Sequence, residues 1–264
     1  MVTPTAYCLV RDRPPYRQDA FHAALRRLGF KLGKISAATR PDPRDLLVIW
    51  NRYGVGDRLA KLFERDGARV LVAENGYLPM RGTKKAFALA LNHHNGAGAW
   101  PRADHPRAHL LDVELRPWRP HTPELLVLPQ RGIGPSGVAM PRAWPDDVRR
   151  RLNLATRQRV RIRRHPGTDR PTSPTLEEDL EGAGACVTWG SGAALKALVA
   201  GVPVFHEFKR WIGAPASTFG IAKTTEPARP DNREQLLERV AWAQWSVEEL
   251  ETGEPLARLL EVRT

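Results

Sequence analysis

A serine flanked by two glycines is the short motif of this chain with the clearest chemical meaning. Gly190-Ser191-Gly192 follows a short strand predicted at 186–188 and precedes AALKALVA, a run of strong helix formers that ends at Gly201. A turn between a strand and a helix presents backbone N–H groups and the positive end of the helix dipole to an anion. The motif predicts a phosphate site; the alternative is a serine that only caps its helix.

Two other loops carry residues suited to the same anion. Val160 and Ile162 alternate with arginines and predict a strand that leads to His165, for which a capping or core histidine is the alternative. A strand predicted at 125–128 leads into a loop with two glycines, whose backbone can approach a phosphate or a sugar. The candidate binding residues of the three loops are Gln130, Arg131, Gly132, Arg164, His165, Pro166, Gly190, Ser191 and Gly192.

An acid stands at the end of another predicted strand. Glu74 follows the strand predicted at 69–73, and ligands of open α/β sheets bind at the carboxyl ends of the strands. A carboxylate there can act as a general base or a nucleophile, and the alternative is a solvated acid in a Glu-Asn-Gly turn. His93 and His94 predict no metal site, because adjacent side chains point apart and no acid at ligand spacing accompanies them.

Strands and helices alternate along the chain. The run 46–50, LLVIW, is apolar throughout, as expected for a parallel strand that is covered on both faces. An irregular segment at 99–123, rich in proline, arginine and tryptophan, separates two such α/β halves. We therefore predict an α/β protein with two Rossmann-like lobes, residues 1–120 and 121–264, and a cleft between them. The expected strands are 6–10, 46–50, 69–73, 87–91, 125–128, 160–162, 186–188 and 202–205, and the expected helices include 16–29, 56–66, 144–154, 232–245 and 254–261.

The chain is strongly basic. Its 264 residues include 41 Lys and Arg against 29 Asp and Glu, which gives a net charge of +12 and a pI near 10.4. Such a field attracts nucleic acid, acidic glycans or anionic membranes, although arginines spread over the whole surface would give the same total. Because no apolar run approaches the ~20 residues of a membrane span and no signal pattern opens the chain, we expect a soluble, cytoplasmic protein.

Four segments together resemble the capsule polysaccharide biosynthesis family, bacterial transferases of 3-deoxy-manno-octulosonic acid (Kdo). The family's Glu-Asp-Gly-Phe-Leu motif is similar to ENGYL at 74–78, and its strand followed by a glutamine is similar to the segment ending at Gln130. Its His-Pro motif corresponds to His165-Pro166, and its serine turn, helix and strand correspond to 191–204. Each motif is short, but they fall in the family's order over residues 70–210.

The resemblance implies a metal-independent glycosyltransferase of the GT-B type, with a UDP- or CMP-linked sugar as co-substrate and no other cofactor. The C-terminal lobe would hold this donor, with His165 and Ser191 at its phosphate, and the N-terminal lobe would face the acceptor. One departure matters, because the family's aspartate is Asn75 here and an amide cannot act as a base. Glu74 or Asp12 would then supply the catalytic carboxylate, unless activity has been lost.

The acceptor must be predicted from the charge. A large positive field favours a hydroxymethylated base in DNA, as in phage-type DNA glycosylation in a bacterial or phage-infected cell, over a Kdo-type capsule or lipopolysaccharide glycan. The base would have to leave the duplex stack. A non-catalytic polyanion-binding protein on a degenerate scaffold and another sugar-nucleotide enzyme, such as an epimerase, are the other classes. The candidate acceptor or DNA contacts are Arg11, Arg13, Asn75, Arg102, Arg107, Arg116, Trp118 and Arg119, the last five in a segment that could also be a solvated linker.

Overall fold

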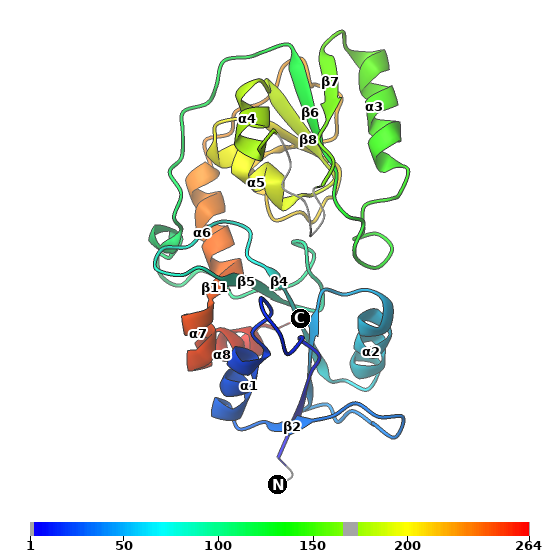
Figure 1. Cartoon of the computed structure of the whole chain (residues 1–264), viewed down its shortest axis with the longest axis vertical. Helices are drawn as coiled ribbons and strands as arrows, with labels where there is room; N and C mark the ends of the chain where they lie inside the picture. The colour runs from blue at the N-terminus through cyan, green and yellow to red at the C-terminus, as the bar shows by residue number, and fades with distance from the viewer. Residues whose placement is uncertain (1–2, 166–173, 264) are drawn as a thin grey trace. The chain divides into compact units, whose positions relative to one another are not determined.

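The computed structural model describes residues 3–165 and 174–263, which form two compact units (Figure 1). The first unit takes the chain up to Asp112 and again from Glu238, and the second takes 113–237. The predicted division into 1–120 and 121–264 differs from this, because the end of the chain returns to the first unit. Among the described helices, none is both long enough and apolar enough to cross a bilayer.

The first unit is built on a six-stranded sheet in the order β11-β5-β4-β3-β1-β2. The four strands from β4 to β2 are parallel, whereas β5 runs antiparallel to β4 and β11 antiparallel to β5. The strands are β1 (Thr5–Cys8), β2 (Lys31–Gly33), β3 (Leu46–Trp50), β4 (Arg69–Asn75), β5 (Ala86–Leu91) and β11 (Gln244–Ser246). The helices are α1 (Gln18–Arg27), α2 (Gly54–Arg65), a 3-10 turn at Ala108–Leu110, the end of α6 (Arg233–Ala243), α7 (Val247–Thr252) and α8 (Glu254–Glu261).

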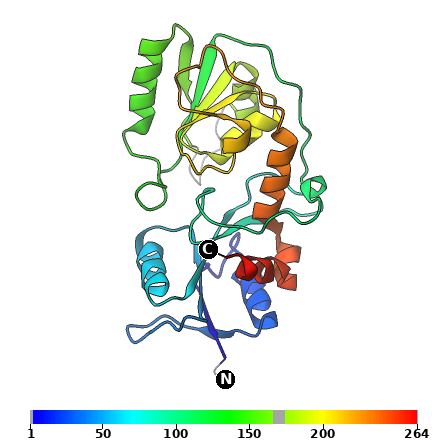
Figure 2. The same cartoon turned by 180° about the vertical axis from the view of Figure 1, so that it is seen from behind.

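Alternate side chains of β3 enter two different cores. Leu46 and Val48 pack with residues of α1, α7 and α8, whereas Leu47 and Ile49 pack with Ala60 and Phe63 of α2. Figures 1 and 2 show α2 on one face of this sheet and the other three helices on the opposite face. Burial of a leucine or isoleucine side chain stabilises the fold by roughly 1.5–3 kcal/mol, so the side chains of β3 hold the helices on both faces to the sheet. The prediction of a strand covered on both faces is confirmed.

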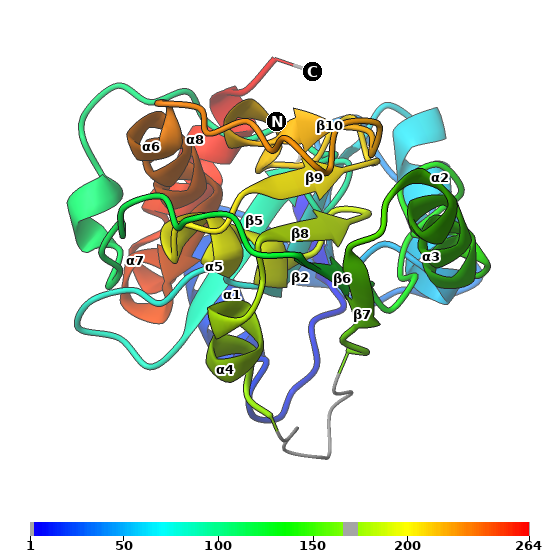
Figure 3. The ribbon, with the colours of Figure 1, turned by 90° about the horizontal axis from the view of Figure 1, so that it is seen from above.

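The second unit has a five-stranded parallel sheet in the order β10-β9-β8-β6-β7. In Figure 3, α3 and α5 lie on opposite sides of it. The strands are β6 (Glu124–Leu128), β7 (Arg159–Ile162), β8 (Ala185–Thr188), β9 (Val204–His206) and β10 (Thr218–Phe219). The helices are α3 (Trp144–Ala155), α4 (Leu176–Glu181), α5 (Gly192–Val199), a 3-10 turn at Ala214–Ala216 and the start of α6.

Local sequence signals set the start of α4 and the end of α5. Thr175 and Glu178 form a reciprocal capping box at the start of α4. Gly201 follows the last residues of α5 with a φ of +78°, where a side chain would be strained, and its added Cβ would also collide with the carbonyl oxygen of Pro117. The capping box therefore fixes where α4 begins, and Gly201 fixes where α5 ends.

Candidate active site

The loops after β6 and β8 meet in the second unit. The chain leaves β6 through α3 toward β7 on one side, and leaves β8 through α5 toward β9 on the other, so that the two loops diverge at a topological switch point. The Gln130 amide Nε2 donates to the carbonyl of Gly190, and the Thr188 hydroxyl donates to the carbonyl of Leu128 at 2.9 Å. The structure therefore brings together two of the predicted phosphate-binding loops.

The side chain of Ser191 caps the start of α5. Its Oγ accepts a hydrogen bond from Ala193 N at 3.2 Å, and its own N–H donates to Thr188 Oγ1 at 2.8 Å. The capping role is thus confirmed. The backbone of the first turn faces an anion at this point, and the Ser191 O–H, which this bond does not use, can also donate to one.

The two glycines of the motif have different surroundings. A Cβ added at Gly190 would lie 3.1 Å from Trp211 Cδ1 and 3.2 Å from Phe208 Cδ1, so the close packing there favours a glycine. A Cβ at Gly192 would meet no atom of the described neighbouring residues within 4 Å. Among the described residues, the space beside the first residue of α5 is therefore open to a ligand.

The loops after β6 and β7 carry positive charge. Arg131 and Gly132 are exposed, and Gly132 adopts a φ of +66°, which favours glycine. Partial burial lowers the pKa of His165, and the charge of Arg131 lowers it further, so the neutral form predominates at pH 7.

The adjacent arginines have separate roles. Arg163 forms an ion pair with the buried Asp179 and donates to the Pro174 carbonyl at 2.7 Å, whereas Arg164 is exposed. Arg164 is therefore the arginine of this pair that can contact a ligand. Pro166, also predicted to bind the donor, lies outside the described residues.

In the first unit, Glu74 is fixed at the end of β4. Its Oε1 accepts hydrogen bonds from the Tyr77 hydroxyl at 2.7 Å and from Asn95 N at 2.8 Å. Burial, and then the charge of Glu74, raise the pKa of Tyr77 well above its usual value, so that the phenol stays a donor. The carboxylate is half-buried and oriented by two donors, as a positioned base would be.

Gln244 of β11 positions this acidic turn. Its buried Oε1 accepts from Tyr77 N at 2.8 Å and Leu78 N at 3.0 Å, and its Nε2 donates to the Leu78 carbonyl at 2.8 Å. One side chain thereby satisfies three backbone groups of the turn. The sequence motif did not predict Gln244, because β11 has only three residues and enters this sheet from the far end of the chain.

Asn75 stands beside a cation and an aromatic group. Its Oδ1 accepts a hydrogen bond from Lys85 Nζ at 2.5 Å, and burial lowers the pKa of Lys85. The ammonium lies 5.8 Å from the ring centre of Trp50, which makes an edge contact with Tyr16 at 4.9 Å. Lys85 and Trp50 are thus further candidate site residues that the sequence did not suggest, and only their positions near strand ends could have pointed to them.

The alternative carboxylate, Asp12, lies in the exposed loop after β1. In the sheet, β3 separates β1 from β4, so at about 4.8 Å per strand the backbones of the two loops start about 10 Å apart. The neighbouring Arg11 donates to the Tyr16 hydroxyl at 3.2 Å, and Arg13 is exposed. Asp12, Arg11 and Arg13 therefore share the carboxyl edge of this sheet with Glu74.

Similarity to known proteins is found in structure and not in sequence. No family model matches the chain, and no curated protein matches its sequence. The β-Kdo 2,4-transferase of Thermosulfurimonas dismutans KpsC superposes with a TM-score of 0.53 at 12% identity, over 92% of this chain and 91% of that chain. The β-Kdo 2,7-transferase of the same KpsC gives 0.51 at 14% identity, over 98% of this chain and 100% of that chain. The chain shares the fold of these KpsC transferases. The predicted α/β fold with two Rossmann-like units is confirmed.

Within this KpsC-like fold, Arg107 is not a surface residue. It is 4% exposed, its Nη2 pairs with Glu249 at 2.8 Å, and its guanidinium lies 3.8 Å from the ring centre of Trp245. The prediction that Arg107 contacts DNA is therefore wrong, because the side chain crosslinks the end of the chain to the irregular segment. Arg102 of the same segment is exposed.

The remaining candidates of that segment belong to the second unit. The Arg119 guanidinium donates to the carbonyls of Ala200 at 3.0 Å and Leu180 at 2.8 Å, close to the ends of α5 and α4. Arg233 covers the ring of Trp118 at 3.9 Å. Arg116 is exposed. Arg119 thus stabilises two helix ends, and Trp118 takes part in a cation–π contact. Of these three residues, only Arg116 presents an unobstructed charge to a polyanion.

Proposed function

We propose that the protein is a glycosyltransferase that moves a sugar from a nucleotide-sugar donor to a hydroxyl of a glycan, without a metal. The observation that carries the proposal is the hydrogen bond from Gln130 to the Gly190 carbonyl, in a fold shared with Kdo transferases. It closes two loops of the second unit around the start of α5. In open α/β sheets, nucleotides bind at the topological switch point, between the loops that follow the two neighbouring strands.

The second unit supplies donor chemistry. As the glycosidic bond to the donor breaks, negative charge develops on the departing phosphate. The backbone at the start of α5, together with Arg131, Arg164 and His165, offers donors and positive charge to that phosphate. His165, neutral at rest, can also take up a proton as the phosphate binds.

The first unit supplies acceptor chemistry. Glu74, held by Tyr77 and Asn95, removes the proton of the attacking hydroxyl as a general base. Half-buried Trp50 offers an aromatic surface to a sugar ring, and Lys85 stands beside it. Because Lys85 already contacts position 75, Asn75 serves here as a hydrogen-bonding residue and not as the base.

The glycan is proposed over DNA as the acceptor. The DNA hypothesis rests on the net charge of +12 and on an arginine-rich segment from which the structure removes Arg107. Two structures that share the fold are named as transferases of Kdo, an acidic sugar. A Kdo-type glycan is therefore the acceptor class to test first.

A donor panel tests the proposal. Incubation with UDP-glucose, CMP-Kdo and related donors should release nucleotide, and mass spectrometry should find the sugar on a Kdo-accepting glycan. Hydroxymethylated duplex DNA in a parallel reaction tests the other acceptor. If no donor is bound or hydrolysed, the polyanion-binding alternative replaces the enzyme.

Replacing His165 with alanine should weaken donor binding by about 1–3 kcal/mol, the scale of a lost hydrogen bond to a charged group. Calorimetric titration with the donor that the panel identifies measures this. Since a phosphodiester does not titrate near neutrality and His165 gains a proton on binding, affinity should rise as the pH falls from about 7.5 to about 5.5. His165→Ala should flatten this profile, whereas His121→Ala, an exposed histidine of the same unit, should leave it unchanged.

A matched pair of glycine substitutions tests the open space at α5. Gly192→Ala should leave the unfolding free energy unchanged or raise it by up to about 1 kcal/mol, because alanine favours a helix. It should weaken donor binding roughly tenfold, since the methyl group fills the approach to the backbone N–H groups. Gly190→Ala should instead lower the unfolding free energy by about 1–3 kcal/mol through overpacking against Trp211 and Phe208. Unchanged donor affinity in a folded Gly192→Ala protein would remove this turn from the donor site.

A further inference from the structure

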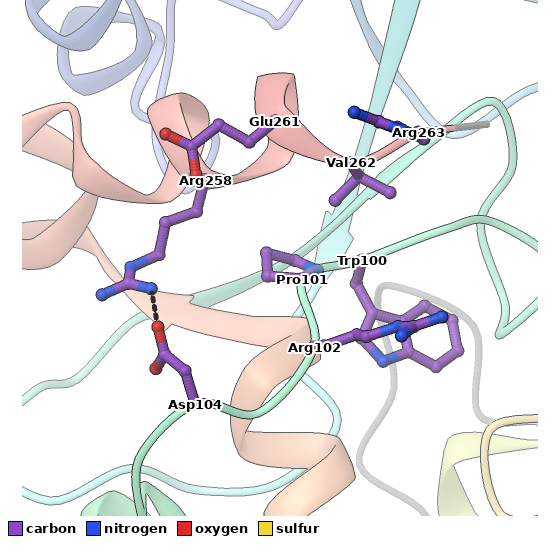
Figure 4. A pocket seen from close by; sticks show the side chains of 8 residues that line it. All are labelled: Trp100, Pro101, Arg102, Asp104, Arg258, Glu261, Val262 and Arg263. Atoms are coloured by element: carbon purple, nitrogen blue, oxygen red, sulfur yellow. Dashed lines mark hydrogen bonds and ion pairs between the residues drawn. The ribbon is translucent and has the colours of Figure 1, made fainter.

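A cavity in the first unit lies away from Glu74. It has a volume of about 460 Å³ and opens between the segment 100–104 and the end of α8 (Figure 4). Ala99, just before this segment, pairs with Leu91, which pairs with Leu71 near the start of β4, whereas Glu74 lies near the opposite end of that strand. The cavity therefore borders the amino edge of the parallel strands, opposite the candidate catalytic edge.

Internal contacts hold the walls of this cavity in place. Arg69, at the start of β4, donates to the Leu260 carbonyl and so fixes the end of α8. Arg258 of α8 donates to Asp104 at 2.7 Å, the contact drawn in Figure 4, and thereby joins the two walls. Arg239 lies 4.8 Å over the ring of Trp100 and fixes its orientation. The cavity is thus a built feature of the unit.

The lining combines an apolar surface with unequal charges. Trp100, Pro101 and Val262 form the apolar part. The charged lining residues are the three arginines Arg102, Arg258 and Arg263 and the two acids Asp104 and Glu261. Asp104 neutralises Arg258, and in the described part of the chain no acid lies within ion-pair distance of Arg102 or Arg263. Two guanidinium groups therefore remain for an anionic ligand.

These groups suit a sugar that carries a carboxylate. An indole packs against the apolar face of a sugar ring, and a guanidinium binds a carboxylate through two parallel hydrogen bonds. The carboxylate oxygens of Asp104 and Glu261 accept hydrogen bonds from hydroxyl groups. A nucleic acid would also use the tryptophan and the arginines, so the choice between the two anions is made by direct binding of both.

We propose that this cavity binds a carboxylated saccharide, such as a segment of an acidic glycan, at a second site remote from Glu74. The volume lies within the range of small-ligand sites. The binding itself does not require the proposed transferase activity. A role in holding an acceptor chain while its end reacts at the other edge rests on that proposed function.

Direct binding measurements test the site. The probes are α-1,4-linked tetragalacturonic acid, the same tetramer with its carboxyl groups reduced to alcohols, and a thymidine tetranucleotide. The acid form should bind at least about tenfold more tightly than the reduced form, because only it makes charge-assisted hydrogen bonds. The double substitution Arg102→Ala and Arg263→Ala should remove most of this difference, and Trp100→Ala should weaken both saccharides.

A charge-matched control separates the site from the general basic field. Arg149→Ala combined with Arg150→Ala, two exposed residues of α3 in the second unit, removes the same charge and should leave binding within about twofold. Equal binding of acid and reduced tetramers, an equal loss in the control, or tighter binding of the tetranucleotide would each overturn the proposal. The release of nucleotide from the donor, measured on the variant with both Arg102 and Arg263 replaced, reports the transferase activity separately. The saccharide site and the proposed function can therefore each fail alone.

Discussion

Glu74→Gln should lower the turnover of the donor by about 10²–10⁴-fold, the usual contribution of a positioned general base. The amide oxygen of glutamine can accept the same hydrogen bonds from Tyr77 and Asn95, so the side chain should keep its place. Only the ability to take a proton is lost. Because the donor is proposed to bind the second unit, its dissociation constant should stay within about twofold.

Asp12→Asn is the matched control for that substitution. It converts the other candidate carboxylate to an amide in an exposed loop, and it should reduce turnover less than about threefold. Initial rates of nucleotide release at saturating donor measure both variants. A large loss in Asp12→Asn with normal turnover in Glu74→Gln would transfer the catalytic role to Asp12.

Elements with complete local patterns could be predicted closely. The apolar run of β3 and the amphipathic α8 have the predicted bounds, 46–50 and 254–261. The strands β2, β10 and β11 have two or three residues, too few for a periodic pattern to develop. The helix α7 was missed although Ser246 and Glu249 form a capping box that the sequence spacing signals.

The candidate site shows where sequence reasoning ends. Motif order predicted that the loops at Gln130 and Gly190 belong together, and the structure joins them by a hydrogen bond. The return of the chain end to the first unit could not be predicted, because Gln244 and Tyr77 meet across 167 positions. Nor does composition distinguish a buried arginine from a surface arginine, which is decided by the acids and rings that fold around it.

Arg107 gives the second large effect. Arg107→Ala should lower the unfolding free energy by about 3–5 kcal/mol, because it leaves Glu249 without its buried partner and opens a space beside Trp242 and Trp245. For a unit of this size, that loss corresponds to a fall in melting temperature of roughly 10–20 °C. Thermal unfolding followed by circular dichroism measures the effect.

Arg102→Ala is the control that decides between a structural and a DNA-binding role for the segment. Both arginines come from the same irregular segment, but Arg102 is exposed and its loss should change the unfolding free energy by less than about 0.5 kcal/mol. The opposite outcome is an Arg107→Ala protein with the melting temperature of Arg102→Ala, but with weaker binding to duplex DNA and a smaller salt dependence of that binding. Arg107 would then contact phosphate, and its burial among tryptophans would not be maintained in solution. A selective loss of stability in Arg107→Ala means that an arginine counted toward a polyanion surface is instead a core residue, so that net charge alone overstates the surface available to DNA.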